Sequence, residues 1–272
     1  MQLVYLNDFY EKEEAIMKAH GISCARMQYP FSKNSLTSKI QEKHIFRGPK
    51  MKTETYLEFV AELRKNNCSV FVKSDDFKKI ADALEYSKCF GKYAPKVVSF
   101  GIEEDANSIA NKLISSDLKY PLFVRSDVES AAKYVGVDAC TLKSADTQAI
   151  TRVIAPIHTH IVNATKIIMK EIVPIKKVEG KNVEYRAIVV NGNIVCFDYE
   201  PLSGLPHPRS LSCVEQFEDC INIANKNGLG GAYFVDFGVD ESDNIFVVEC
   251  KNIINGTIKN INAFAEGLSQ MN

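Results

Sequence analysis

The sequence predicts a mixed α/β (α+β) protein whose C-terminal part is an antiparallel sheet. Three observations support this fold class. The N-terminal part alternates strand-like and helix-like patterns, and this rhythm implies a small parallel sheet with helices on its faces. The pair Asn191-Gly192 lies between two apolar runs and is a strong hairpin signal. The turn Glu241–Asn244 separates two further apolar runs, which predicts a second hairpin.

The N-terminal elements follow from the spacing of apolar residues. In the clearest helix, four apolar side chains recur at helical spacing between Tyr56 and Leu63. Gly21 closes an earlier helix, and Asp75 can cap a later one. We therefore expect, in order, a strand over Met1–Leu6, a helix over Phe9–His20, a helix over Thr53–Asn66, a strand over Cys68–Val72 and a helix through Phe77, Ile80, Ala81 and Leu84.

The pattern resets near Pro95 and becomes rich in strands towards the C-terminus. Ser212 and Glu215 form a capping box that opens a helix, and Gly228 ends that helix. Besides this helix we expect strands over Lys96–Phe100, Pro121–Arg125, Ile167–Val173, Glu184–Val190, Asn193–Phe197, Tyr233–Val239 and Ile245–Cys250, with helices over Ala106–Ile114 and Asp146–Ile154.

The composition is that of an ordinary globular chain. The 272 residues carry 33 basic and 34 acidic side chains, and 46% of the residues are hydrophobic. The formal net charge of −1 argues against a protein whose main task is to coat nucleic acid or an anionic membrane, while a local basic patch and nucleic-acid binding stay open. The sequence has neither a membrane-spanning apolar run nor the basic start of a signal peptide, so we expect a cytoplasmic protein. The eight scattered cysteines are expected to be reduced.

Two carboxylates face each other on the second predicted hairpin. If Asp240 and Ile245 flank a four-residue turn, Asp236 lies directly opposite Glu249. Opposed side chains have Cβ atoms about 4.5–5.5 Å apart and share one face of the sheet. Two carboxylates at this distance need a cation, or one of them must hold a proton. Mg²⁺ is a suitable cation because it takes oxygens from one or two carboxylates together with substrate phosphates.

Lys251 offers an alternative to a metal ion. It has the same strand parity as Glu249, so its ammonium can neutralise the carboxylate pair. The hairpin alone leaves three interpretations open, namely a metal site, a structural ion-pair cluster and a different register.

Three cations are candidates for phosphate binding. Arg125 ends an apolar strand, and Lys133 follows eight residues later. A cation at a strand end, then a flexible stretch and a second cation, suits a loop that lies over phosphates. Arg186 lies near the start of the first predicted hairpin, beside Glu184. The alternatives are a solvated arginine at the strand end and a cross-strand ion pair for Arg186.

The order of these motifs resembles the ATP-grasp superfamily. More narrowly, it is similar to the arginine-and-lysine clade of that superfamily, which is often found in bacterial and phage genomes. The segment R-G-P-K-M-K-T-E-T-Y, from Arg47 to Tyr56, is similar to the segment before a helix in the N-terminal region of that clade. The other matching motifs are Arg125 with Lys133, K-E-I-V-P from Lys170, E-Y-R from Glu184, F-V-D-F around Asp236 and V-V-E-C-K-N up to Asn252.

The resemblance implies an ATP-grasp fold in three parts. A pre-ATP-grasp α/β region is expected over 1–93, a small lobe over 94–166 and a large catalytic lobe over 167–272. The two lobes are expected to enclose a cleft for the nucleotide.

The resemblance also implies ATP and Mg²⁺ as cofactors and gives roles to individual residues. Arg125 and Lys133 are expected to contact the ATP phosphates, with Arg125 where most members have lysine. Arg186 and Lys251 are the expected catalytic residues, and Arg186 would steady the transferred phosphoryl group. The adenine-binding strand is expected at Lys170, Glu171, Ile172 and Val173, and the metal ligands are expected to be Asp236, Glu249 and Asn252.

Two positions depart from the family pattern. Members usually carry E-x-N, whose asparagine is a further metal ligand, whereas Lys251 takes that place here. Asn252 has the opposite strand parity and reaches the metal only if the strand bulges or ends there. The usual glycine-rich phosphate loop is replaced by the stiffer segment Glu129–Lys133.

The activity that the resemblance implies is an ADP-forming ligase. Such an enzyme activates a carboxylate as an acyl phosphate, which an amine or another nucleophile then attacks. The expected partners are a small-molecule or peptide carboxylate and a nucleophile. The alternatives are an ATP-dependent phosphotransferase and a non-catalytic nucleotide-binding assembly module, for which Lys251 is the best argument.

Overall fold

A computed structural model describes the chain except for residues 8–9, 29–39, 41–42, 50, 200–203 and 272. The chain forms two compact units. Unit 1 combines Met1–Ala81 with Ile175–Asn272, and unit 2 is Asp82–Pro174. The division into parts at 1–93, 94–166 and 167–272 stays a prediction. In the described part of the chain, every helix is too short or too polar to cross a membrane.

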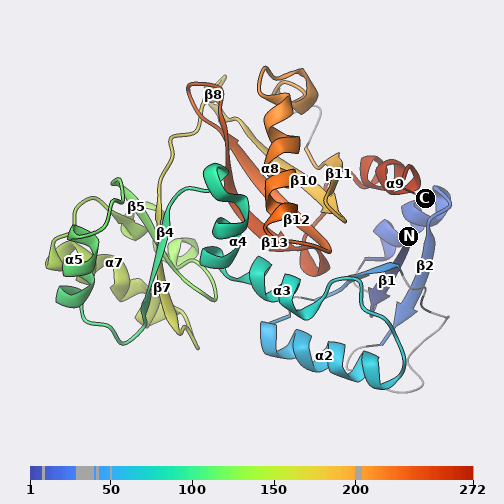
Figure 1. Ribbon diagram of the computed structural model, residues 1–272, viewed down its shortest axis with the longest axis horizontal. Helices are drawn as coiled ribbons and strands as arrows, with labels where there is room; N and C mark the ends of the chain where they lie inside the picture. The colour runs from blue at the N-terminus through green and yellow to red at the C-terminus, as the bar shows by residue number, and fades with distance from the viewer. Residues whose placement is uncertain (8–9, 29–39, 41–42, 50, 200–203, 272) are drawn as a thin grey trace. The chain divides into compact units, whose positions relative to one another are not determined.

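The N-terminal part of unit 1 contains the predicted parallel sheet, with strand order β2-β1-β3. Figure 1 labels β1 and β2 of this sheet. Strand β1 is buried along its whole length because it lies in the centre of this sheet. The predicted helix over Phe9–His20 is present from Glu11 onward, and Phe9 lies outside the described residues. The elements are β1 (Gln2–Leu6), α1 (Glu11–Ala19), β2 (Ser23–Met27), β3 (His44–Arg47) and α2 (Thr53–Lys65).

The third strand of this sheet is not the one that the sequence predicts. No strand forms over Cys68–Val72, and His44–Arg47 pairs with β1 instead. The chain turns directly after α2, where Asn67 has a φ of 58°, and the Tyr56 hydroxyl donates to the Val72 carbonyl at 2.6 Å. The predicted strand is wrong because Val72 is buried without strand pairing, and its carbonyl accepts from a side chain of α2. Strand β3 is hard to recognise because its two ends are His44 and Arg47, both buried.

The helix predicted after Asp75 is interrupted at Asp82. Helix α3 (Ser74–Ala81) ends there, and α4 (Ala83–Phe90) begins with Asp82 as its N-cap. The Asp82 carboxylate accepts a hydrogen bond from the Leu84 amide at 2.9 Å, which is the usual N-cap interaction. Asp75, the predicted cap, lies instead in the first turn of α3.

Unit 2 is an antiparallel sheet with strand order β4-β7-β5-β6. Helices α5 and α7 pack with the sheet in one apolar core, and Asp105 and Asp146 cap their N-termini. The strands and helices predicted here are confirmed, although α7 continues past Ile154. The elements are η1 (Gly91–Tyr93), β4 (Val97–Gly101), α5 (Ala106–Ile114), β5 (Leu122–Ser126), α6 (Ala132–Val135), η2 (Asp138–Cys140), β6 (Thr141–Leu142), α7 (Thr147–His160) and β7 (Lys166–Glu171).

The C-terminal part of unit 1 is the predicted antiparallel sheet, with strand order β11-β10-β12-β13. Both predicted hairpins are confirmed. Helix α8 covers one face of this sheet, where the Phe217 ring lies 5.0 Å from the Phe237 ring (Figure 1). The elements are β8 (Lys177–Val178), β9 (Lys181–Asn182), β10 (Glu184–Val190), β11 (Asn193–Phe197), η4 (Pro208–Ser210), α8 (Val214–Lys226), β12 (Ala232–Val239), β13 (Ile245–Asn252), η5 (Ile253–Asn255) and α9 (Ile261–Ser269).

The predicted capping box of α8 is wrong. Cys213 is the N-cap residue, and no side chain there makes a capping hydrogen bond. Ser212 lies one residue outside the cap position, so its spacing to Glu215 no longer matches the motif.

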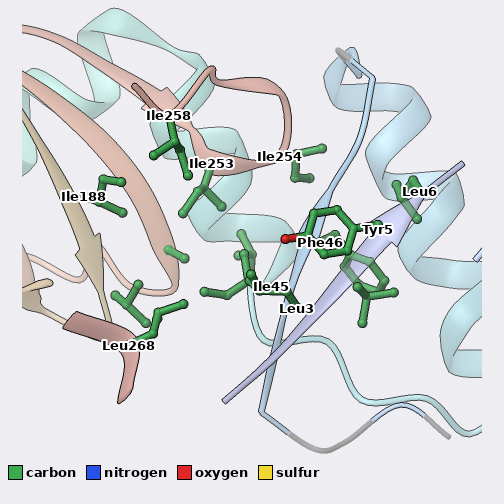
Figure 2. Packing of buried hydrophobic residues seen from close by; sticks show 14 of the residues in the cluster. Leu3, Tyr5, Leu6, Ile45, Phe46, Ile188, Ile253, Ile254, Ile258 and Leu268 are labelled. Atoms are coloured by element: carbon green, nitrogen blue, oxygen red, sulfur yellow. The ribbon is translucent and has the colours of Figure 1, made fainter. Parts of the chain in front are cut away.

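The N-terminal sheet and the segment after β13 share one apolar core. Figure 2 shows Ile253 and Ile254 beside Ile45 and Phe46, and all four belong to one buried cluster. A buried ion pair reinforces this contact. The Arg47 guanidinium, 0% exposed, contacts Glu13 through Nε and Nη2 at 2.8 Å each and donates to the carbonyls of Ile253 and Gly256. The segment after β13 is therefore held by β3.

Candidate functional site

Asp236 and Glu249 lie directly opposite each other on β12 and β13, as predicted. The route to this pairing differs from the predicted one. Val239 pairs with Ile245, one position away from the expected register, and a bulge between Asp236 and Phe237 restores the pairing, with Val248 as the extra residue. Without the bulge, Glu249 would share the buried face of Val247. The bulge therefore places Glu249 on the face of Asp236, which is opposite α8 because the neighbouring Phe237 packs against Phe217.

Arg186 joins this pair from the neighbouring strand β10. It lies opposite Asp236 in the ladder. Its Nε donates to Asp236 Oδ1 at 2.6 Å, and its Nη2 donates to Oδ2 at 3.0 Å. This bidentate geometry is the strong form of an arginine–carboxylate contact. The cross-strand ion pair considered for Arg186 is thus present, with Asp236 as the partner.

Lys251 completes the cluster. Its Nζ lies 3.0 Å from Asp236 Oδ2 and 2.8 Å from Glu249 Oε2. The two cations and two carboxylates form one neutral group, which we call the sheet-face cluster (Arg186, Asp236, Glu249 and Lys251). The ion-pair interpretation of the hairpin is therefore what the structure contains.

The contacts within the sheet-face cluster favour its charged forms. Burial raises the pKa of Asp236, but the hydrogen bond from Arg186 and the charge of Lys251 outweigh burial, so the pKa lies below its usual value. Burial lowers the pKa of Lys251, but Glu249 and Asp236 raise it by more. The hydrogen bond to Asp236 raises the pKa of Arg186. All three groups are held ionised at neutral pH.

Asn252 lies on the other face of the sheet. It pairs with Tyr233, and β13 runs without a second bulge from Glu249 to Asn252. Its Oδ1 is buried, and no donor reaches it among the described residues. Asn252 therefore does not share a face with Glu249 and Asp236.

Asp198 is a neighbour of this cluster that the sequence did not reveal. It directly follows β11, and its amide donates to the Arg186 carbonyl at 2.7 Å. Its Oδ1 accepts from the amides of Lys259 and Asn260 at 2.7 Å each, just before α9. The side chain is 4% exposed, and Oδ2 has no partner in the part of the chain that the structure describes. Burial raises the pKa of Asp198. The hydrogen bonds from the two amides and the charge of Arg186 lower this pKa, but by less, so it stays above its usual value.

Asp198→Asn is expected to stabilise the protein at neutral pH. A pKa raised in the folded state means that the folded protein prefers the neutral acid, so this stabilisation is complete below the ordinary value of 3.8 and is lost as the pH rises through the folded-state value. The neutral amide avoids that loss. Urea unfolding of both proteins between pH 3 and 7 measures the difference, which should grow with pH. Asp138→Asn, at an exposed position, should give no such trend.

A cavity of about 430 Å³ lies in unit 1 beside Lys259 and Asn260, whose amides donate to Asp198. Its lining includes Lys12 from α1 and Tyr199, together with Lys259 and Asn260 just before α9 and Asn262 in its first turn. Two lysines, two amides and a phenol are groups that bind an anion such as a carboxylate.

In unit 2, the structure brings Arg125 and Lys170 onto one face of the sheet. Arg125 lies opposite Ile168, and Lys170 shares the strand parity of Ile168. This face is opposite to the one that carries the core residues Val124 and Met169. Lys133 lies on α6, where it forms an ion pair with Glu129.

The predicted adenine-binding segment extends β7. The Ile172 amide donates to the Pro121 carbonyl at 3.0 Å, so the ladder continues past Glu171. The Glu171 carboxylate accepts from the Lys119 amide at 2.8 Å and is thereby fixed. Val173 follows and is half-buried.

Comparisons with known proteins give a likeness in structure only. No family model matches the chain, and no curated protein matches it. Among solved structures, the D-cycloserine synthetase DcsG matches with a TM-score of 0.64 at 13% identity over 100% of this chain and 99% of that chain. A RimK domain ATP-grasp protein from Sphaerobacter thermophilus matches with a TM-score of 0.59 at 12% identity over 99% and 100%. The N5-carboxyaminoimidazole synthetase from Staphylococcus aureus, complexed with ADP, matches with a TM-score of 0.60 at 13% identity over 98% and 76%.

The chain has the ATP-grasp fold. The predicted fold class is thereby confirmed over the whole chain. The arginine-and-lysine clade stays a prediction. The described residues contain no group of three or more histidine, cysteine or acidic side chains arranged for a metal ion. Any divalent ion would therefore have to combine the two carboxylates of the sheet-face cluster with oxygens from a ligand.

Proposed function

We propose that the protein is an ATP- and Mg²⁺-dependent ligase that forms ADP. The γ-phosphoryl group of ATP would pass to a carboxylate oxygen and release ADP. An amine or another nucleophile would then attack the acyl carbon and displace phosphate, while the nucleophile loses a proton. The observation that carries this proposal is the sheet-face cluster, because two cations and two carboxylates on one sheet face match the needs of phosphoryl transfer.

The proposed roles follow from charge. Arg186 and Lys251 would contact the transferred phosphoryl group, because triphosphate oxygens are strong acceptors for both cations. Asp236 and Glu249 would hold Mg²⁺, whose chemistry is to neutralise charge on the phosphates. The two carboxylates fit such an ion once the nucleotide gives Arg186 and Lys251 other anionic partners. Arg125, Lys133 and Lys170 would bind phosphates, and Glu171, Ile172 and Val173 would bind the adenine.

The cavity beside Asp198 supports a carboxylate as the substrate. Lys12 and Lys259 supply two positive charges there, and Asn260 and Asn262 supply amide donors. Its volume of about 430 Å³ suits a small molecule or the end of a peptide. We propose that an acidic substrate binds in this cavity.

Product analysis with ATP labelled in the γ-phosphate tests the proposal. The full chain is incubated with Mg²⁺, labelled ATP and pooled amino acids or peptides. A ligase releases labelled free phosphate and ADP, and added hydroxylamine traps the acyl phosphate as a hydroxamate. A stable phosphorylated product would instead identify a phosphotransferase.

A non-catalytic nucleotide-binding module is the second candidate. The contact of Lys251 with both carboxylates favours it, because the cluster is already neutral without a metal. This candidate predicts that ATP binds without turnover in any acceptor mixture. Release of ADP that depends on an added acceptor would exclude it.

A further inference from the structure

The ammonium of Lys251 lies where a cation would bridge the two facing carboxylates. It is within hydrogen-bond distance of both, at 3.0 Å from Asp236 Oδ2 and 2.8 Å from Glu249 Oε2. Lys251 follows Glu249 by two residues on β13, so strand geometry holds both side chains on one face. The carboxylate pair is therefore already bridged by a cation of the chain itself.

The arrangement makes a divalent ion and the ammonium alternatives. With Arg186 also bound to Asp236, the sheet-face cluster has no net charge. A divalent ion that enters this neutral group must displace the Lys251 ammonium or lie beside it, and like charges at such short distances repel. The ammonium leaves without loss only when another anion takes its place. A triphosphate is such an anion.

We propose that Lys251 is a built-in competitor of the divalent ion, which excludes the ion from Asp236 and Glu249 until the nucleotide binds. This inference rests on the proposed function in taking those carboxylates as the metal ligands. Nucleotide oxygens draw the ammonium away, and the freed carboxylates then accept the ion. Because such coupling is reciprocal, the ion strengthens nucleotide binding by the same factor.

The binding of Mn²⁺ alone to the full chain tests this competition. Free Mn²⁺ is followed by electron paramagnetic resonance, without nucleotide or substrate. The wild-type protein is expected to bind Mn²⁺ weakly. Lys251→Met leaves two facing carboxylates with one guanidinium, so Mn²⁺ binding should tighten by about tenfold or more.

Three control variants separate competition from a general effect on charge. Lys251→Arg keeps the cation and should bind Mn²⁺ as weakly as the wild type. Lys176→Met removes an ammonium that lies 2.6 Å from Asp243, a residue in the turn of the same hairpin. This variant should bind Mn²⁺ as weakly as the wild type, because it leaves only one carboxylate without its cation. Adding Asp236→Asn to Lys251→Met should cancel the gain. Circular dichroism shows that each variant is folded.

Two results would overturn the inference. One is a wild-type protein that binds Mn²⁺ alone as tightly as Lys251→Met does, and the other is a folded Lys251→Met variant with no gain. Product analysis with labelled ATP tests the ligase activity separately. A gain in Mn²⁺ binding by Lys251→Met together with no turnover by the wild-type protein would therefore contradict the ligase proposal while supporting the competition.

Discussion

Asp236→Asn is expected to abolish turnover of Mg-ATP while leaving the fold intact. The wild-type carboxylate accepts two hydrogen bonds from Arg186 and one from Lys251, and the proposal makes it a metal ligand as well. The amide keeps the shape of the side chain but provides one neutral acceptor oxygen in place of a charged pair. We expect kcat to fall by about 10²–10³-fold or more, the size of the loss when one group that stabilises transition-state charge is removed. The measurement is ADP release with the substrates found by product analysis.

A matched variant on the same hairpin controls for loss of a paired carboxylate. Asp243 accepts a hydrogen bond from Lys176 at 2.6 Å in the turn between β12 and β13, and its φ of 60° suits asparagine. Asp243→Asn should therefore retain both fold and turnover. If Asp236→Asn also retained turnover, Asp236 would not be a ligand of the reacting complex.

Arg47→Met is expected to lower the free energy of unfolding strongly. This change leaves the Glu13 carboxylate, 4% exposed, without its cation, and it removes the donors to the carbonyls of Ile253 and Gly256. Removing one partner of a buried ion pair costs about 3–5 kcal/mol because the other charge stays buried. Urea unfolding followed by circular dichroism measures the loss.

Two comparisons show whether the loss of stability arises from the Glu13 carboxylate that is left buried without its cation. Adding Glu13→Leu to Arg47→Met should recover part of the stability, because the unpaired charge is then absent. Lys65→Met breaks the exposed pair between Lys65 and Glu62 and should change stability by less than about 0.5 kcal/mol. If Arg47→Met lost as little stability as Lys65→Met, the buried pair would not stabilise the fold.

The two hairpins show how far local sequence predicts structure. Asn191-Gly192 and the turn Glu241–Asn244 lie between the strands that they predict. Neither register follows from the turn alone, since each hairpin contains a bulge. In the second hairpin, the bulge restores the predicted pairing of Asp236 with Glu249. In the first, counting from the turn places Asp198 opposite Tyr185, whereas the irregularity places it beside Arg186.

Long-range burial explains most of what could not be predicted. Strand β3 carries His44 and Arg47, which read as exposed residues in the sequence. Both are buried in the tertiary structure. The Arg47 guanidinium contacts Glu13, which is 34 residues away in the chain, and the carbonyls of Ile253 and Gly256 after β13. The run at Cys68–Val72 satisfies the pattern of a strand, but it stays unpaired and only Val72 in it is buried, with its carbonyl bonded to Tyr56 of α2.

The sequence by itself determined the types of most elements, both hairpins and the facing carboxylates, because hydrophobic periodicity and turn residues act between near neighbours in the chain. Only the tertiary structure decided that Arg186 and Lys251 neutralise these carboxylates, that Asp198 lies beside them and that Asn252 does not. These outcomes depend on bulges and on pairing between distant strands. The energies that fix them come from packing and charge contacts across the sheet, which no local pattern records.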